Sequence, residues 1–310
     1  MALCTFEGAR FLEEQLDSIL GQTVLPDELV VCDDGSSDWT VDILQAFRDV
    51  APFPVRIERN PRLLGSTANF GKAIGLCSEQ VIVLCDQDDV WLPLRLEITA
   101  DVFGRRPDLG LFFSDAELID DRSRPTGERL WWRLGIRPAA IGAYLSGDRI
   151  DRVEQLTWGN LVTGATAAFR TSFRDLVLPI PDGWVHDAWI ALILSASAPV
   201  EASTVPLVRY RVHPAQQIGI HSPGEGKRRT QLVRRARKRE RYLMRRQSAL
   251  LATAAERLRA AGLERPPEPG LLEYLEGKAR HFAVRGAIDR PGRLATIARE
   301  VRAGGYRRFS

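Results

Sequence analysis

Two aspartates at the end of an apolar run have the spacing of a site for metal-bound phosphate. Asp86 and Asp88 follow the run 81–85, and Asp89 comes directly after them. In an extended chain, residues two apart point to the same side. Mg²⁺ and Mn²⁺ prefer carboxylate oxygens, and Mg²⁺ shares its coordination shell with substrate phosphates. The spacing therefore favours a divalent cation that holds a diphosphate. The alternative is a solvated acidic turn in which Asp89 caps the next segment.

A second pair of carboxylates, Asp33 and Asp34, also follows an apolar run and precedes Gly35. Carboxylates accept hydrogen bonds from a base N–H or a ribose hydroxyl, and glycine permits close approach of the backbone. The pattern also fits a strand-to-helix turn with Ser37 or Asp38 as the N-cap. The two interpretations are compatible.

The elements that carry these acids alternate between β-rich runs and helical periods through about residue 115. The apolar runs occupy 1–5, 28–34, 54–60, 80–86 and 109–115. Helical spacing occurs over 11–20 and over 66–77, where Ser66 is the expected N-cap. This alternation predicts a Rossmann-like α/β fold, with a mostly parallel central sheet and helices on both faces. Ligands bind such sheets at the carboxyl ends of the strands, so we expect one site that joins Thr5 to both acidic pairs.

The rest of the chain divides less regularly. Residues 120–155 have a weak pattern and are predicted to form an insertion or lid, whereas a helix starts near His186 and a strand covers 206–213. A long basic helix is expected after Gly226 to about Ala261. The linker 262–270 and two short helical pieces follow. We predict a first domain over 1–222, with halves 1–115 and 116–222, and a basic helical C-terminal extension over 223–310.

Charge is distributed unevenly along the 310 residues. Eleven Lys/Arg and one Glu fall within 227–246, whereas the remaining residues carry 32 basic and 39 acidic side chains, a net charge of −7. A basic amphipathic helix suits an anionic membrane surface. A helix packed on the protein with its arginines outward is the alternative. No nucleic acid is expected as a partner, because the segment has one aromatic residue and the body is acidic.

The composition also bears on the compartment. No apolar run reaches the roughly 18 residues of a spanning helix, and the first residues lack the features of a signal peptide. The four cysteines lack CxxC spacing and lie in or beside apolar runs, which predicts reduced thiols in a cytoplasmic protein. They are Cys4, Cys32, Cys77 and Cys85.

Six segments in order carry a resemblance to a known family. They are CTFEGARFLEEQLDSILGQT, VVCDDGSSDWTVDIL, NFGKAIGLCSEQVIVLCDQDDVWLP, VTGATAAF, HDAWIALILSA and VRYRVHPAQQIG. Together they resemble the family 2 glycosyltransferases with the GT-A fold, especially the bacterial rhamnosyltransferase-like branch. The resemblance covers about residues 1–220.

The resemblance implies roles for individual residues on the donor side. Thr5 and Glu7 stand where the family contacts the nucleotide base, and Asp33 and Asp34 where it holds base and ribose. The other positions assigned to the nucleotide sugar are Asn69, Lys72, Asp86 and Gln87. Two departures concern the donor: Glu7 replaces the usual Asn, and Ala68 replaces a frequent basic residue.

The resemblance also implies the catalytic and metal roles. Asp187 matches the catalytic base, while Asp88 and His213 match the positions that bind Mg²⁺ or Mn²⁺. A metal stabilises the leaving diphosphate, and a single displacement with one base inverts the anomeric centre. Without the resemblance, Asp187 would equally be a first-turn acid of a helix. The positions assigned to the acceptor side are Trp91, Gly164 and His186.

The expected function is therefore metal-dependent inverting transfer of a sugar, rhamnose by the resemblance, from a dTDP- or UDP-sugar. The acceptor would be a saccharide or a lipid-linked precursor of a cell-surface polysaccharide, used at the inner face of the plasma membrane. A haloacid dehalogenase-like phosphatase is the alternative, because Asp86-x-Asp88-x-Val90 fits its motif, but that class places the motif on its first strand. A nucleotidyltransferase would need a glycine-rich basic loop after the first strand, and residues 4–11 do not supply one.

Overall fold

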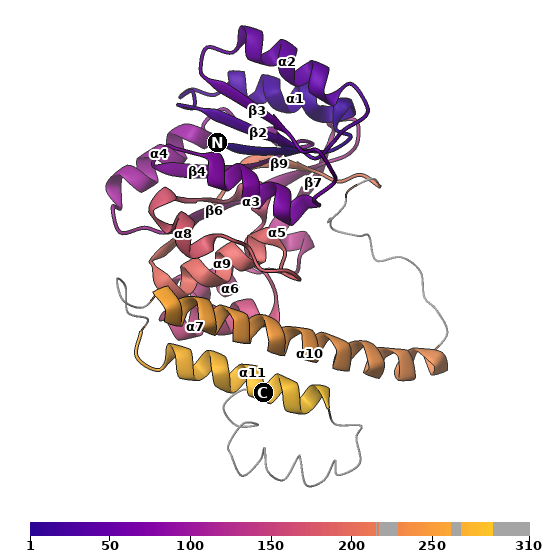
Figure 1. Cartoon of the computed structure of the whole chain (residues 1–310), viewed down its shortest axis with the longest axis vertical. Helices are drawn as coiled ribbons and strands as arrows, with labels where there is room; N and C mark the ends of the chain where they lie inside the picture. The colour runs from indigo at the N-terminus through magenta and orange to yellow at the C-terminus, as the bar shows by residue number, and fades with distance from the viewer. Residues whose placement is uncertain (215, 217–228, 262–267, 288–310) are drawn as a thin grey trace. The chain divides into compact units, whose positions relative to one another are not determined.

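The structure is a computed structural model that describes residues 1–214, 216, 229–261 and 268–287 (Figure 1). The chain divides into two compact units, Met1–Ile220 and His221–Ser310. The first unit holds the β-sheet, and the described part of the second unit is helical. Among the described helices, none is both long and apolar enough to cross a membrane.

The first half of unit 1 follows the predicted alternation of strands and helices. Its parallel strands lie in the order β3 (Val55–Arg59), β2 (Leu29–Asp33), β1 (Ala2–Thr5) and β4 (Val81–Asp86). The intervening helices are α1 (Ala9–Leu20), α2 (Thr40–Val50) and α3 (Ser66–Leu76), and α4 (Arg95–Arg105) follows. Thr5 pairs with Asp33 and Cys4 with Asp86, so the polar strand ends meet at one edge, as predicted.

Helices cover both faces of these strands. Figure 1 shows α1 and α2 on one side of the strands and α3 on the other. The apolar stripe of α1, which includes Leu12 and Leu16, is fully buried. The N-cap of α3 is Gly65 rather than the predicted Ser66, because Gly65 turns the chain at a φ of 87° and its carbonyl accepts the first helical hydrogen bond. Glycine adopts such a positive φ without steric cost.

The second half of the sheet mixes strand directions. β8 (Ala168–Arg170) runs antiparallel to β4 and to β6 (Leu111–Ile119), and β9 (Val200–Arg211) runs parallel to β6. The short β5 (Val90–Trp91) pairs antiparallel with β9, and β7 (Pro125–Arg129) pairs with β6. The α/β class is confirmed. β9 begins before the predicted residue 206, and strands as short as β5 and β8 leave no periodic signal in the sequence.

The region predicted as an irregular insertion contains regular elements. Besides β7 it holds α5 (Leu130–Arg133), α6 (Pro138–Ser146) and α7 (Arg149–Trp158). A capping box starts α7, since the side chain of Asp148 accepts a hydrogen bond from the Asp151 N–H and the reverse bond is also present. The elements that follow are η1 (Gly164–Thr166), η2 (Thr171–Phe173), α8 (Arg174–Val177) and α9 (His186–Ser197), the last at its predicted start.

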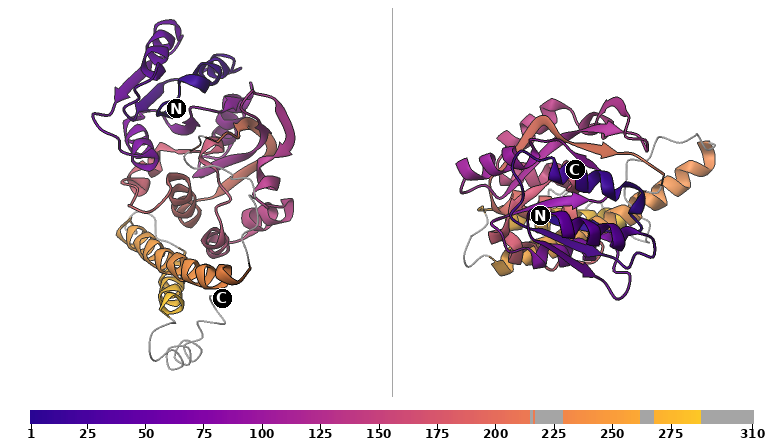
Figure 2. Two further views of the ribbon diagram at one scale, coloured as in Figure 1. Left: turned by 90° about the vertical axis from the view of Figure 1, so that its right-hand side faces the viewer. Right: turned by 90° about the horizontal axis from the view of Figure 1, so that it is seen from above.

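In the described part of unit 2, α10 (Arg229–Ala261) and α11 (Leu271–Gly286) pack side by side (Figure 2). Leu251, Leu258 and Leu275 are buried. The predicted long helix ending near Ala261 is therefore present. Part of the predicted basic segment, together with most of the linker and the last helical piece, lies outside the described residues.

Candidate active site

A cleft of about 350 Å³ opens at the carboxyl ends of β1 and β4, a size typical of small-molecule sites. Loops after β1, β2 and β4 line it, together with η1, the start of α9 and the segment after β9. The predicted site residues that line this central cleft are Thr5, Glu7, Asp34, Asn69, Asp86, Gln87, Asp88, Gly164, His186, Asp187 and His213. Three others, Asp33, Lys72 and Trp91, do not line it.

Asp88 and His213 come together in the cleft although they are distant in sequence. Nε2 of His213 lies 2.8 Å from Oδ2 of Asp88. Pairing of Val90 with Arg209 brings the end of β9 beside the Asp88 turn. The His213 ring also contacts the Phe11 ring, with centroids 4.8 Å apart. An imidazole and a carboxylate at this distance form one donor set for a cation.

Asp86 lies in an acidic environment beside this pair. Burial and the carboxylates of Asp88 and Asp187 raise the pKa of Asp86 to about 7. Like charges at short range oppose ionisation, so an arriving cation favours the ionised form. The carboxylates of Asp86, Asp88 and Asp187 therefore repel one another, and a bound cation would relieve this repulsion.

The donor set fits a divalent cation that shares its ligands with substrate. Within the described part of the chain, no group of three or more His, Cys, Asp or Glu side chains could hold a metal ion. Mg²⁺ is commonly bound through one or two carboxylates and completes its shell with water and substrate phosphates. Asp88 and His213 would supply the protein ligands. Nδ1 of His213 is buried and has no hydrogen-bond partner in this structure.

Asp89 fastens the end of β9 and does not cap a helix. Its Oδ1 accepts a hydrogen bond from the Arg211 N–H at 3.0 Å. Burial and the carboxylates of Asp88 and Asp86 raise its pKa well above the ordinary value. The N-cap of the following α4 is Leu94, so the predicted capping role of Asp89 is wrong.

Two buried arginines that the sequence does not predict, Arg211 and Arg95, support the acidic turn. Arg211 donates from Nη2 to Glu14 at 2.6 Å and from Nη1 to the Ser123 hydroxyl at 2.8 Å. Arg95 donates to the carbonyls of Ala165 and Leu84 at 2.5 and 3.0 Å. Arg211 falls within a segment that carries the resemblance, but no local pattern distinguishes a buried arginine from an exposed one.

Gln87 joins the acidic turn to the loop after β1. Its Oε1 accepts from the Phe6 N–H at 2.8 Å, and its Nε2 donates to the Phe6 carbonyl at 3.0 Å. A Cβ atom on Gly8 would lie 2.2 Å from the same Oε1, so any other residue there would displace the Gln87 amide. The amide predicted to contact the nucleotide sugar is thus used to hold the backbone of the β1 loop.

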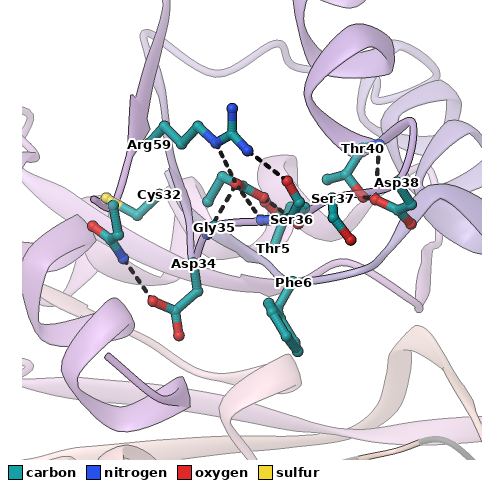
Figure 3. Close-up of polar contacts among 12 residues, drawn as sticks. Thr5, Phe6, Cys32, Asp34, Gly35, Ser36, Ser37, Asp38, Thr40 and Arg59 are labelled. Atoms are coloured by element: carbon teal, nitrogen blue, oxygen red, sulfur yellow. Dashed lines mark hydrogen bonds and ion pairs between the residues drawn. The ribbon is translucent and has the colours of Figure 1, made fainter. Parts of the chain in front are cut away.

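Asp33 and Asp34 have different surroundings, and Figure 3 labels Asp34 with several of its neighbours. Asp33 is fully buried and accepts from Thr5 Oγ1 at 2.9 Å and from the Ser36 N–H at 2.9 Å, which keeps it out of the cleft. Asp34 points to the same side as Phe6 and lines the cleft. Its carboxylate accepts from the amides of Leu64 at 2.8 Å and Gly65 at 2.7 Å and from Asn60 Nδ2 at 2.9 Å.

Glu7, Asn69 and Lys72 order the walls around Asp34. Glu7 has a φ of 49° and accepts from the Ser37 N–H at 2.7 Å. Asn69 accepts from Asn60 Nδ2 at 2.8 Å. The Lys72 ammonium donates to Asn60 Oδ1 at 2.9 Å. Lys72 therefore supports Asn60 and does not line the cleft itself.

The opposite wall carries Asp187, His186 and Gly164. Oδ2 of Asp187 accepts from the Gly164 N–H at 3.1 Å. His186 stacks on Phe70 with ring centroids 4.0 Å apart, and burial lowers its pKa, so its imidazole is neutral near pH 7. A Cβ atom on Gly164 would lie 2.7 Å from His186 Nε2, which explains the glycine. Asp187 is in the first turn of α9, and the residue also lines the cleft.

Trp91 lies in the hydrophobic core rather than on the acceptor side. Its side chain is buried, and the Arg95 guanidinium sits 3.9 Å from its ring centroid. The arrangement of the remaining residues can bind a metal-associated anion at Asp88 and His213 and accept a proton at Asp187. The acidic motif ends β4 rather than the first strand, which is against the phosphatase alternative.

Comparison with protein families matches residues 2–177 to the model described as Glycosyl transferase family 2. A curated relative is the E. coli UDP-Glc:alpha-D-GlcNAc-diphosphoundecaprenol beta-1,3-glucosyltransferase WfgD, 25% identical over 119 residues that make up 38% of this chain and 46% of WfgD. The chain spans between 20% and 46% of the length of the curated relatives it matches.

Solved structures with a similar fold include S. aureus TarS 1-349 in complex with UDP, with a TM-score of 0.57 and 14% identity. That match covers 91% of this chain and 71% of TarS 1-349. The mannosyltransferase PcManGT from Pyrobaculum calidifontis in complex with GDP-Man and Mn²⁺ matches with a TM-score of 0.50 and 18% identity, over 97% of this chain and 79% of PcManGT. These similarities support the GT-A fold.

Proposed function

Because this chain belongs to glycosyl transferase family 2, we propose that it transfers a sugar from a nucleotide-diphosphate donor to an acceptor hydroxyl, with inversion. The observation that carries the proposal is the convergence of Asp88, His213 and Asp187 on one cleft. The first two form a donor set for a cation, and the third is a carboxylate on the other wall.

Asp88 and His213 would hold Mg²⁺ or Mn²⁺ together with the diphosphate of the donor. When bound, such a cation neutralises the negative charge that develops on the leaving diphosphate. Support comes from the donor set itself and from PcManGT, which was solved with GDP-Man and Mn²⁺. The raised pKa of Asp86 gives the cleft a further carboxylate that ionises when positive charge arrives.

Asp187 is proposed as the base for the acceptor. The acceptor oxygen attacks the anomeric carbon, the bond from that carbon to the diphosphate oxygen breaks, and the acceptor proton passes to the Asp187 carboxylate. The hydrogen bond from the Gly164 N–H fixes one oxygen of this carboxylate and keeps it oriented. A single displacement of this kind inverts the anomeric centre.

We propose a pyrimidine nucleotide as the donor carrier, UDP or dTDP, with rhamnose among the sugars to test. TarS was solved with UDP, and WfgD is named for UDP-Glc. The acceptor is proposed to be a saccharide or a lipid-linked precursor of a cell-surface polysaccharide, since WfgD is named for a diphosphoundecaprenol acceptor. The basic segment 227–246 would then place the protein on the inner face of an anionic membrane.

The test is calorimetric titration of UDP, dTDP and GDP, each with and without Mn²⁺, into the wild-type protein and Asp88→Asn. One nucleotide should bind in a manner that needs both Mn²⁺ and Asp88. Asp175→Asn is the matched control, because the Asp175 side chain is 98% exposed and lies outside the cleft. Binding that is indifferent to Mn²⁺ and to Asp88 would contradict the metal role.

A second measurement addresses the base. Asp187→Asn should keep nucleotide affinity within about twofold and lose about a hundredfold or more of the transfer rate, in line with general-base contributions. Full transfer by Asp187→Asn would show that another group takes the proton.

A further inference from the structure

The central cleft is lined by many acids and few cations. Its acidic lining residues are Glu7, Asp34, Asp86, Asp88 and Asp187. Among the described residues that line it, Arg10 is the single Lys or Arg. A nucleoside diphosphate brings more negative charge into this space, and like charges at short range repel. Besides a metal, the cleft therefore has one fixed positive group for a phosphate.

Three cations in or behind the walls of the cleft, Lys72, Arg95 and Arg211, are already engaged. Lys72 donates to Asn60 at 2.9 Å, and it does not line the cleft. Arg95 donates to the carbonyls of Ala165 and Leu84 from a fully buried position. Arg211 is likewise buried and pairs with Glu14. Turning any of these three groups to a ligand would break a hydrogen bond that it makes in this structure.

The backbone amides of Gly8 and Ala9 at the start of α1 are also engaged, so these two N–H groups are not offered to an anion. The Gly8 N–H donates to the Thr40 hydroxyl at 2.8 Å, and the Ala9 N–H donates to the Asp38 carboxylate at 3.0 Å. Recognition of negative charge at this end of the cleft falls to the Arg10 side chain.

Arg10 lies next to the proposed metal ligands. Its Cζ is 4.7 Å from the centroid of the Phe11 ring, and the same ring contacts His213 with centroids 4.8 Å apart. His213 in turn lies 2.8 Å from Asp88. Because Arg10, Asp88 and His213 also line the same cleft, the phosphates of a substrate bound there can lie within reach of the Arg10 guanidinium.

The present partner of Arg10 is weakly held. Nη2 of Arg10 lies 2.9 Å from Oδ2 of Asp121, in a pair whose side chains are 61% and 41% exposed. Exposed pairs of this kind contribute little to stability, because water screens both charges. Arg10 can exchange Asp121 for a phosphate at small cost, and arginine matches phosphate geometry with two parallel N–H groups.

We propose that Arg10 is a phosphate-binding residue of the cleft, held by Asp121 in the free protein and transferred to the phosphate of a bound substrate. The inference rests on the proposed function and adds a residue to it. The phosphate belongs either to the nucleotide-sugar donor or to a lipid-linked acceptor, and the two sources are separable by experiment.

The experiment titrates the tighter binder of UDP and dTDP, with Mn²⁺, into wild type, Arg10→Ala, Arg10→Lys and Asp121→Asn. Arg10→Ala should weaken diphosphate binding about tenfold, the effect of one charge-assisted hydrogen bond, and Arg10→Lys about threefold. The corresponding nucleoside, which has no phosphate, should bind all four proteins equally. Arg105→Ala is the matched control, since Arg105 forms an exposed pair with Asp101 on α4, away from the cleft.

Asp121→Asn separates a ligand role from a structural one. If Arg10 binds phosphate, releasing it from Asp121 should leave the affinity unchanged or raise it up to about threefold. If the Arg10–Asp121 pair only holds the fold, Asp121→Asn and Arg10→Ala should weaken binding alike, and the proposal is overturned.

The source of the phosphate follows from a transfer assay on the same proteins. Unchanged diphosphate affinity in Arg10→Ala, with a raised KM for a diphosphate-linked acceptor but not for a free saccharide, assigns Arg10 to the acceptor. No change in either quantity overturns the inference while the proposed function stands. A wild-type protein that binds no nucleotide with Mn²⁺ overturns both.

Discussion

Arg211 donates a hydrogen bond from Nε to the backbone carbonyl of Asp88 at 2.7 Å. The bond joins the last residue of β9 to the turn that carries the acidic motif. The same guanidinium reaches Glu14 on α1, so one buried side chain fixes the turn against both a strand and a helix. Asp88 is thereby presented to His213, two residues beyond Arg211.

Arg211→Lys is expected to destabilise the protein by about 2–4 kcal/mol, since a lysine cannot make the separate hydrogen bonds of the buried guanidinium. Urea unfolding measures this loss, and calorimetry should show weaker Mn²⁺-dependent nucleotide binding. Arg209→Lys is the matched control on the same strand, where the side chain is 44% exposed, and should stay within about 0.5 kcal/mol of wild type. Equal stability of the two variants would remove Arg211 from this role.

The pKa of Asp86, raised to about 7, predicts a pH dependence of metal binding. Below pH 7 the free protein holds a proton on this carboxyl, and the positive charge of a bound cation favours release of that proton. Affinity for Mn²⁺ with nucleotide should therefore rise from pH 5.5 to 7 by up to about tenfold per pH unit and then level off. Calorimetry across this range checks the slope. Asp86→Asn should reduce it, and an unchanged slope would assign the proton to another group.

The raised pKa of Asp86 also makes the stability of the folded protein depend on pH. Stability without metal should fall as pH rises, whereas metal affinity rises. A carboxyl whose pKa is higher in the folded state than in the unfolded state binds more protons when folded. Its contribution is full below the unfolded pKa and is lost as pH rises toward 7. Without metal, the free energy of unfolding of wild type should fall relative to that of Asp86→Asn over this interval.

Gly8→Ala should disrupt the contact between the β1 loop and the acidic turn, because the new Cβ would lie 2.2 Å from Gln87 Oε1. We expect a loss of about 1–3 kcal/mol, the usual cost of overpacking, and weaker nucleotide binding. Gly142→Ala is the control: it lies in α6 with nothing within 4 Å of an added Cβ, so it should be neutral or stabilising. The double variant Gly8→Ala, Gln87→Ala should recover part of the stability, and a purely additive result would argue against the clash.

The sequence predicted the parts of this fold that have a long enough pattern to recognise. Strands β1 to β4 and helix α9 begin or end close to their expected residues, because apolar runs and amphipathic spacing are local signals. The two-residue β5 and three-residue β8 are too short to show alternation. The N-cap of α3 was misplaced by one residue, since a glycine with positive φ competed with a serine.

Some residues of the active site could also be predicted from the sequence, and others could not. Asp34 and Asp86 could be expected at strand ends, whereas the meeting of Asp88 with His213 depends on pairing between distant segments and came only from the resemblance. Trp91 and Lys72 lie outside the cleft because their side chains contact Arg95 and Asn60. The spacing of residues in the sequence does not predict such contacts. Arg211 supports the site but could not be predicted to do so. Charged residues are rarely buried, so a local pattern assigns an arginine to the surface.

The position of β9 has a consequence for the order in which the protein can assemble. Among the described residues β9 is the last strand, yet it lies inside the sheet between β6 and β5. A chain that leaves the ribosome from its N-terminus can pair β1 with β2 and β4 early, but β5 has no neighbour in the sheet until β9 is made. Until residues 200–213 emerge, Asp88 and Asp89 lack the contacts that they make with Arg211 and His213 in the folded protein. Completion of the sheet and completion of the active site are therefore one event.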